Sequence, residues 1–116
     1  MITPKRWHIY IVDLEPRVGS KPVKQRPCIA IQPSEFAQWG LPSTVILPLT
    51  SKISSENTYP LRVSIPKATC GLKDPSEALV DQILAWDNSL FREDLGEVPV
   101  AIQDEIKLAV REFLDI

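Results

Sequence analysis

Eleven prolines spread along the 116 residues constrain this chain more than any other feature of its sequence. Proline lacks a backbone N–H and fixes φ, so it is poorly tolerated inside helices and central strands. The prolines punctuate short runs rich in β-branched and aromatic residues, at 8–14, 27–32, 44–49 and 61–66. This pattern predicts a small, mainly β barrel of short antiparallel strands rather than a bundle of long helices.

Two short segments between or after these runs have helical character instead. The run PSEFAQWGLP predicts a short helical turn that Gly40 and Pro42 bring to an end. Residues 87–93 predict one further turn, with Asp87 or Asn88 as its N-cap. Both turns are short enough to connect strands without adding a separate layer.

The last element is the clearest one in the sequence. From Pro99 onward the apolar residues recur at helical spacing and predict an amphipathic C-terminal helix that closes the core. Its inward residues are Ile102, Ile106, Ala109, Val110 and Phe113. In the run at 61–66 the inward residues of the predicted strand are Leu61, Val63 and Ile65.

Length and composition place the chain among ordinary globular proteins. With 116 residues, 44% of them apolar and 24% charged, we expect one domain spanning residues 1–116. No run approaches the ~18 apolar residues that span a bilayer, and the N-terminus lacks the apolar core of a signal peptide. We therefore expect a cytoplasmic protein. Cys28 and Cys70 are expected to be reduced, small apolar residues in or near strands.

A basic loop is predicted between the first two strands, at residues 15–25. Four cationic side chains fall within ten residues in this loop and directly after it: Arg17, Lys21, Lys24 and Arg26. The pair Thr50-Ser51 ends the third predicted strand. If the strands pack closely, guanidinium and hydroxyl donors meet, and such donors suit the binding and stabilisation of a phosphate.

Charge is distributed unevenly along the chain. Residues 1–52 contain seven Lys and Arg against three Asp and Glu, whereas residues 53–116 contain six against twelve. A basic surface is therefore compatible with the formal net charge of −2. Both sets could equally be scattered, solvated side chains.

The interpretation of these residues as a phosphate-binding site has structural alternatives. Arg26 could form a salt bridge with Asp13 or Asp81, and Thr50-Ser51 could serve only as a strand-ending turn. The loop lysines could simply be solvated. These alternatives can be separated only by knowing how the strands pair.

Other common chemistries lack their residues in this sequence. A single histidine, His8, cannot build a zinc site alone, and no set of residues has metal-ligand spacing. Neither GxxxxGK[ST] nor GxGxxG occurs. Neither cysteine is part of a nucleophile motif. With these excluded, the residues favour electrostatic or acid-base chemistry at a bound phosphate, without a cofactor.

Four segments carry a family resemblance. The run IYIVDLEPRVGS, the Arg26-Pro27 step into a strand, the LTSKI segment and the DQI at 81–83 occur in the order and spacing of MazF/PemK-type toxins. The chain resembles these toxins from about Ile9 to the C-terminal helix. The resemblance implies an SH3-like or CcdB-like antiparallel barrel, mainly β within the α+β class. It also implies a strand at 76–86, where local propensity alone allows a helix.

The function implied by the resemblance is that of a metal-independent, sequence-specific endoribonuclease toxin. In such enzymes the RNA 2′-hydroxyl attacks the adjacent phosphate and leaves a 2′,3′-cyclic phosphate and a 5′-hydroxyl. By position, Arg26 and Thr50 match the family's catalytic pair. The residues expected to contact single-stranded RNA, such as mRNA, are Ser20, Lys21, Lys24, Ser51 and Gln82.

The chain departs from the family pattern at several positions. Where many members have Ser-Glu-Gln it has Ser20-Lys21-Pro22, so a glutamate proposed as general base in part of the family is absent. A basic position after the DQI triplet is Leu84, and a Gly-acid pair before the first strand is replaced by Trp7-His8. The proton acceptor is thus left open between Lys21, His8 and another group.

The resemblance also implies partners. We expect a homodimer neutralised by an antitoxin whose acidic, partly disordered tail replaces RNA in a basic groove. Two alternatives remain: a degenerate member that binds RNA or antitoxin without cleaving, and a CcdB-like toxin directed at gyrase. Trp7, Trp39 and Trp86 could stack on bases, although at least two of them are expected in the core or a dimer interface.

Overall fold

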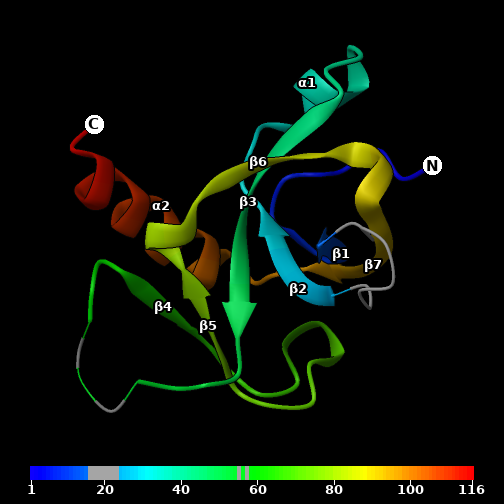
Figure 1. Cartoon of the computed structure of the whole chain (residues 1–116). Coiled ribbons are helices and arrows are strands. Elements are labelled where there is room, and N and C mark those ends of the chain that lie inside the picture. Colours follow the sequence, from blue (N-terminus) through cyan, green and yellow to red (C-terminus); the bar gives the residue numbers. More distant parts are fainter. Residues whose placement is uncertain (16–23, 55, 57) are drawn as a thin grey trace.

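The computed structural model describes residues 1–15, 24–54, 56 and 58–116 (Figure 1). The predictions made for Arg17, Ser20 and Lys21 lie outside the described residues. The elements follow in the order β1 (His8–Glu15), β2 (Lys24–Ala30), α1 (Ser34–Gln38), β3 (Ser43–Thr50), β4 (Arg62–Ile65), η1 (Thr69–Gly71), β5 (Ser76–Leu79), η2 (Val80–Gln82), β6 (Leu84–Asp87), η3 (Asn88–Leu90), β7 (Phe91–Glu97) and α2 (Val100–Leu114).

The strands form one antiparallel, seven-stranded sheet. Its order is β4-β5-β3-β2-β1-β7, and β6 pairs with β3 beside this path. The long strand β3 runs through the middle of the molecule and joins β1, β2 and β7 to the pair β4–β5 (Figure 1). The mainly β prediction is confirmed, but the expected barrel is not closed, because β4 and β7 each pair with one neighbour in the described part of the chain.

Side chains from the two faces of β1, β2 and β3 enter two apolar clusters. Ile9, Ile29 and Leu47 lie in the larger cluster, while their neighbours Tyr10 and Cys28 lie in the smaller one. Both faces of these strands are buried at 9–10, 28–30 and 46–49, so the apolar residues there follow one another instead of alternating with polar ones. This double burial is why the first three strands could be predicted from composition.

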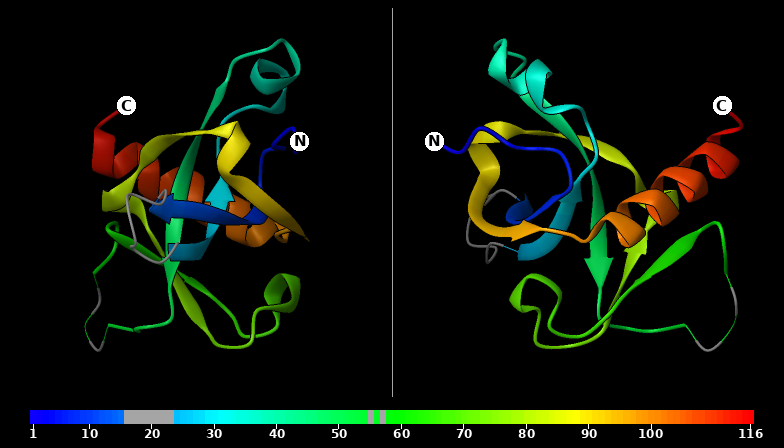
Figure 2. Two further views of the ribbon diagram at one scale, coloured as in Figure 1. Left: turned by 45° about the vertical axis from the view of Figure 1, so that its right-hand side comes forward. Right: turned by 180° about the vertical axis from the view of Figure 1, so that it is seen from behind.

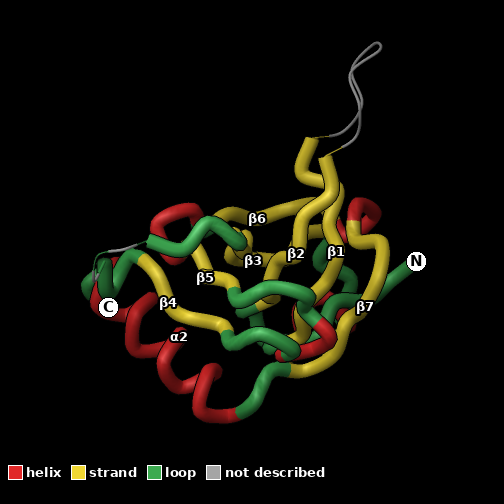
Figure 3. The backbone as a smooth tube through the Cα atoms, turned by 90° about the horizontal axis from the view of Figure 1, so that it is seen from below, coloured by secondary structure: helices red, strands yellow, loops and turns green. Residues whose placement is uncertain are grey.

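The helix α2 covers the larger cluster. It contacts β4 and η2, and Figures 2 and 3 show it beginning just after the end of β7 and running along the β4–β5 side of the sheet. Ile102, Ile106 and Ala109 are buried and Val110 packs against the same cluster, as the helical spacing predicted. The prediction for Phe113 was wrong: its side chain lies in the last turn, where the helix extends past the sheet, and is 37% exposed.

The segment predicted as one strand at 76–86 is interrupted. β5 and β6 pair with opposite ends of β3, with Leu49 opposite Ala78 and Ile46 opposite Leu84. The 3₁₀ turn η2 takes the chain out of the ladder between them. The interruption exposes Gln82.

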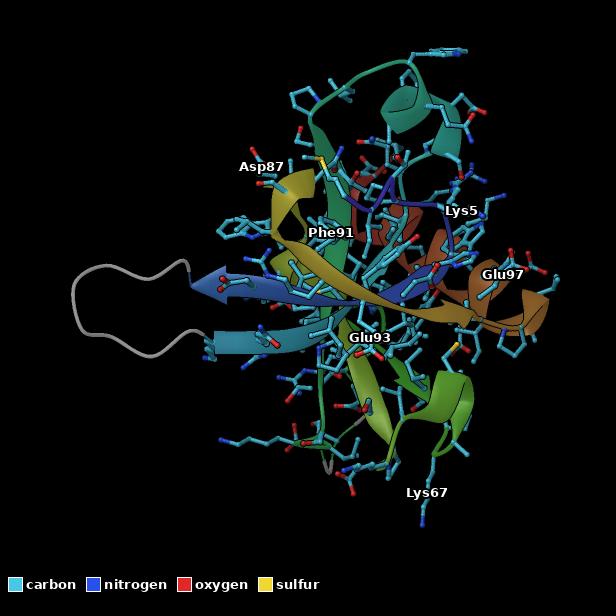
Figure 4. The ribbon with its side chains drawn as sticks, turned by 90° about the vertical axis from the view of Figure 1, so that its right-hand side faces the viewer. Lys5, Lys67, Asp87, Phe91, Glu93 and Glu97 are labelled. Carbon is cyan, nitrogen blue, oxygen red and sulfur yellow. The ribbon has the colours of Figure 1, made fainter. Side chains whose placement is uncertain are left out.

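The predicted turn at 87–93 is only half right. Asp87 caps η3 by accepting a hydrogen bond of 2.8 Å from the backbone N–H of Ser89. From Phe91 onward, however, the chain forms β7, an edge strand that pairs with β1 (Figure 4). Phe91 is buried, whereas Glu93 and Glu97 are exposed. Charged residues protect an exposed sheet edge from further pairing, and they also hide its β pattern in the sequence.

The fourth predicted strand begins one residue later than expected. Val63 and Ile65 are buried in β4, but Leu61 is 39% exposed because it belongs to the preceding turn, where its N–H donates to the carbonyl of Thr58.

Among the described helices, none is long and apolar enough to cross a membrane.

Candidate functional site

Strand pairing brings Arg26 and Thr50 to one site. The β2–β3 ladder ends where Cys28 lies opposite Pro48, and Arg26 and Thr50 each lie two residues beyond that pair at the same end of the two strands. Both residues line a depression of about 490 Å³. Arg26 is half-buried where β2 leaves the core, and Thr50 is half-buried at the end of β3.

Arg26 also lines a neighbouring depression of about 610 Å³. We call the residues around these two hollows the Arg26 face. Five described cations line it, together with two carboxylates: Lys24, Arg26, Lys52, Arg62, Lys73, Asp74 and Asp81. A chain with a net charge of −2 therefore has a locally cationic surface around Arg26, which attracts a polyanion.

The guanidinium of Arg26 has no hydrogen-bond or ion-pair partner among the described residues. The salt bridge considered from the sequence is not formed there, because Asp13 pairs with Arg92 at 3.5 Å and Asp81 is exposed. A guanidinium presents five N–H donors in a planar fork, and it stays protonated in proteins. Arg26 can therefore offer two parallel hydrogen bonds to an oxyanion.

The Thr50 hydroxyl oxygen accepts a hydrogen bond of 3.2 Å from the backbone N–H of Lys52. This is the turn that the sequence allowed as an alternative. The bond uses a lone pair of the hydroxyl, so its O–H remains a donor directed elsewhere. The turn and the donor role are thus compatible, and exposed Ser51 lines the same depression.

Two of the remaining RNA-contact predictions meet Arg26 in the larger depression. Lys24 and Gln82 both line it, and both are exposed. Ser20 and Lys21 lie outside the described residues. Three further cations of this face carry no local sequence signal, because they reach it only through the pairing and turns of later strands: Lys52, Arg62 and Lys73.

His8 lies away from this face. It begins β1, and its Nδ1 is 3.0 Å from a carboxylate oxygen of Asp94. Arg26 pairs with Val12, four residues further along the strand. Four strand residues span about 13 Å. His8 is therefore too far from Arg26 to take a proton from the same phosphodiester.

The two cysteines and two of the tryptophans have structural positions. Cys28 is fully buried, and burial raises the pKa of its thiol to about 12. Burial also raises the pKa of half-buried Cys70. Trp86 donates its indole N–H to the carbonyl of Asp13 at 2.7 Å, and Trp7 packs against the larger apolar cluster.

Comparison with known proteins places this chain in a family. Residues 5–114 match the model of the PemK-like, MazF-like toxins of type II toxin-antitoxin systems. Endoribonuclease MazF6 of Mycobacterium tuberculosis is 31% identical over 111 residues, which cover 96% of each chain. Endoribonuclease EndoA of Bacillus subtilis is 25% identical over 107 residues, covering 92% of this chain and 90% of that one.

Solved structures share the fold. The MazE-MazF structure from Deinococcus radiodurans aligns with a TM-score of 0.79 at 22% identity and covers 99% of each chain. A mycobacterial endoribonuclease in complex with its cognate antitoxin aligns with a TM-score of 0.75 at 20% identity, over 100% of this chain and 97% of that one. The fold is thus that of the MazF toxins. The chain belongs to the PemK-like, MazF-like toxin family, and the relatives named above are endoribonucleases.

Proposed function

We propose that this protein is an endoribonuclease toxin that cleaves single-stranded RNA at specific sequences without a metal ion. The family and the names of its relatives support the activity. The observation that carries the residue assignment is that Arg26, with no partner in the described chain, lines one depression with Thr50. Two such donors lining one depression of a cationic surface suit a substrate phosphate.

The proposed reaction needs no protein nucleophile. The 2′-oxygen of the RNA attacks the adjacent phosphorus and loses its proton, and the bond from phosphorus to the 5′-oxygen of the next nucleotide breaks. That oxygen takes up a proton, so the products carry a 2′,3′-cyclic phosphate and a 5′-hydroxyl. Water is not consumed in this step, and no electrons are transferred to or from the protein.

Arg26 and Thr50 act by stabilising charge. As the 2′-oxygen attacks, negative charge accumulates on the non-bridging oxygens, and the Arg26 fork and the Thr50 hydroxyl donate hydrogen bonds to them. A preorganised donor of this kind contributes about 10²- to 10³-fold in rate. Neither group takes the 2′-hydroxyl proton, because Arg26 stays protonated and Thr50 serves as a donor.

We also propose where the protein acts and which partners it has. We propose that the protein works in the cytoplasm as a homodimer. We further propose that an antitoxin with an acidic segment competes with RNA for the cationic Arg26 face. The mycobacterial relative in complex with its cognate antitoxin supports the antitoxin. Competition predicts that RNA and antitoxin displace one another in a salt-sensitive manner.

The test is cleavage of a long RNA in EDTA by the parent protein and Arg26→Ala, with fold verified by circular dichroism. We expect fragments with cyclic phosphate ends from the parent protein, and a rate about 10³-fold lower for the variant. Arg92→Gln alters an arginine outside the Arg26 face and leaves the buried Asp13 without its partner, so its fold is verified in the same way; as the matched control, the folded variant should cleave normally. Cleavage by folded Arg26→Ala at the parental rate would reject the assignment.

Measurements of RNA binding and of gyrase inhibition, made beside the cleavage assay, separate the two alternative functions. Intact RNA with retained, salt-sensitive binding would indicate a degenerate member that no longer cleaves. Inhibition of gyrase with neither RNA cleavage nor RNA binding would indicate a CcdB-like toxin.

A further inference from the structure

Arg62 forms, with Glu77, an ion pair in the β4–β5 hairpin next to the proposed site. Arg62 Nη1 lies 3.2 Å from Glu77 Oε1, and the arginine lines the larger depression together with Arg26, Lys24 and Gln82. The pair comes from strands far from Arg26 in the sequence. It reaches the site because β5 pairs with β3, where Glu77 lies opposite Thr50.

Glu77 fixes the position of this arginine. Its side chain is 9% exposed, and its Oε1 also accepts a hydrogen bond of 3.0 Å from the backbone N–H of Ser54. A carboxylate removed from water is strongly unfavourable unless it is paired. Glu77 therefore holds the Arg62 guanidinium in one position. Because the side chain is already ordered, binding a ligand costs less conformational entropy than it would for a free surface arginine.

The Arg62 guanidinium retains binding capacity. Its protein contacts use Nη1 alone, which donates to Glu77 and, at 3.5 Å, to the carbonyl of Lys52. No described residue accepts a hydrogen bond from Nε or Nη2. The side chain is 34% exposed, so these donors are open to a ligand.

We infer that Arg62 is an RNA-binding residue that holds a phosphate next to the scissile one, with Glu77 as the residue that positions it. The inference rests on the proposed function, because the scissile phosphate is the one assigned to Arg26 and Thr50. An RNA strand running from the smaller depression past Arg26 into the larger one meets the second fork there. Arg62 thus contributes to binding of the substrate, whereas Arg26 contributes to the chemical step.

The experiment measures binding without cleavage. A short 2′-O-methylated oligoribonucleotide pool lacks the attacking hydroxyl, and its Kd is followed by fluorescence anisotropy over a range of salt concentrations. We expect Arg62→Gln to raise Kd about tenfold and to lower the slope of log Kd against log [salt] by about 0.7, the value for one phosphate contact on a single strand. Arg62→Lys should recover the slope but only part of the affinity, because it keeps the charge and loses the fork.

Two further variants separate binding from folding. Arg62→Gln alone leaves Glu77 buried and unpaired, which should destabilise the fold. The double variant Arg62→Gln/Glu77→Gln removes both charges and should restore stability. It should still show the same loss in the slope of log Kd against log [salt]. Arg92→Gln disrupts a comparable arginine–aspartate pair with Asp13 outside the Arg26 face, and it should leave the slope unchanged.

The outcomes distinguish this inference from the proposed function. Parental slopes in both Arg62→Gln and the folded double variant would overturn the role of Arg62, whatever the cleavage assay shows. A reduced slope in a protein that never cleaves RNA would support Arg62 and reject the nuclease. In a protein that cleaves, we also expect Arg62→Gln to raise KM for RNA with kcat unchanged.

Discussion

Thr50→Val removes one hydroxyl while keeping the shape of a β-branched side chain, so it isolates what that hydroxyl contributes. The variant takes the acceptor from the Lys52 N–H, but this residue is exposed and water can replace the bond. The free energy of unfolding should therefore fall by less than about 1 kcal/mol. Any large effect on cleavage must then come from the lost donor rather than from the fold.

The expected effect on catalysis is much larger. Loss of one preorganised donor lowers kcat by about 10²- to 10³-fold, and the half-buried position of Thr50 favours the lower end because water partly replaces the hydroxyl. The assay is single-turnover cleavage of a fluorescent RNA in EDTA at saturating protein. Thr50→Ser keeps the donor and is the matched control, expected within about tenfold of the parent. If Thr50→Val cleaves as fast as Thr50→Ser, the hydroxyl does not stabilise the transition state.

Two further predictions concern the fold. Ile106→Ala should lower the free energy of unfolding by about 2–5 kcal/mol in urea titrations, because Ile106 is fully buried on the inner face of α2. Leu108→Ala, on the exposed side of the same helix, should change it by less than about 0.5 kcal/mol. Equal effects of the two substitutions would contradict the observed inner face of the helix. The pKa of the Cys28 thiol is about 12 in the folded protein and near its ordinary value of 9.0 in the unfolded chain. Between these two pH values the unfolded state binds fewer protons than the folded state. The free energy of unfolding should therefore fall by up to about 1.4 kcal/mol per pH unit in this range. Cys28→Ala should flatten this fall, and an unchanged slope would refute the buried thiol as its source.

The parts of the fold that the sequence predicted are those with local signals. β1, β2 and β3 bury both faces where they cross the core, so consecutive apolar residues mark those parts of the strands, and α2 repeats its buried residues at helical spacing. β7 has neither signal, because Phe91 is its only buried residue and the exposed edge is occupied by charge. The break at η2 depends on how β5 and β6 share β3, which no local pattern encodes.

The site was predictable to the same extent. Arg26 and Thr50 could be paired because both lie near the ends of two consecutive, well-defined strands, and the resemblance pointed to the same two residues. Arg62 and Glu77 could not be found this way. Arg62 lies near Thr50 only because β4 pairs with β5 and β5 pairs with the end of β3, and the isolated RVSI run does not indicate either pairing. The pair Arg26 and Thr50 follows from neighbouring strands, whereas the pair Arg62 and Glu77 depends on the register between strands far apart in the sequence.

The most direct test of the central claim, that one phosphodiester is held by both a guanidinium and a hydroxyl, is a double-mutant cycle on Arg26→Ala and Thr50→Val. Residues that act as a unit on the same transition state give non-additive losses. We predict that the double variant cleaves RNA about as slowly as Arg26→Ala alone. Losses that multiply, as for independent sites, would contradict a shared phosphate.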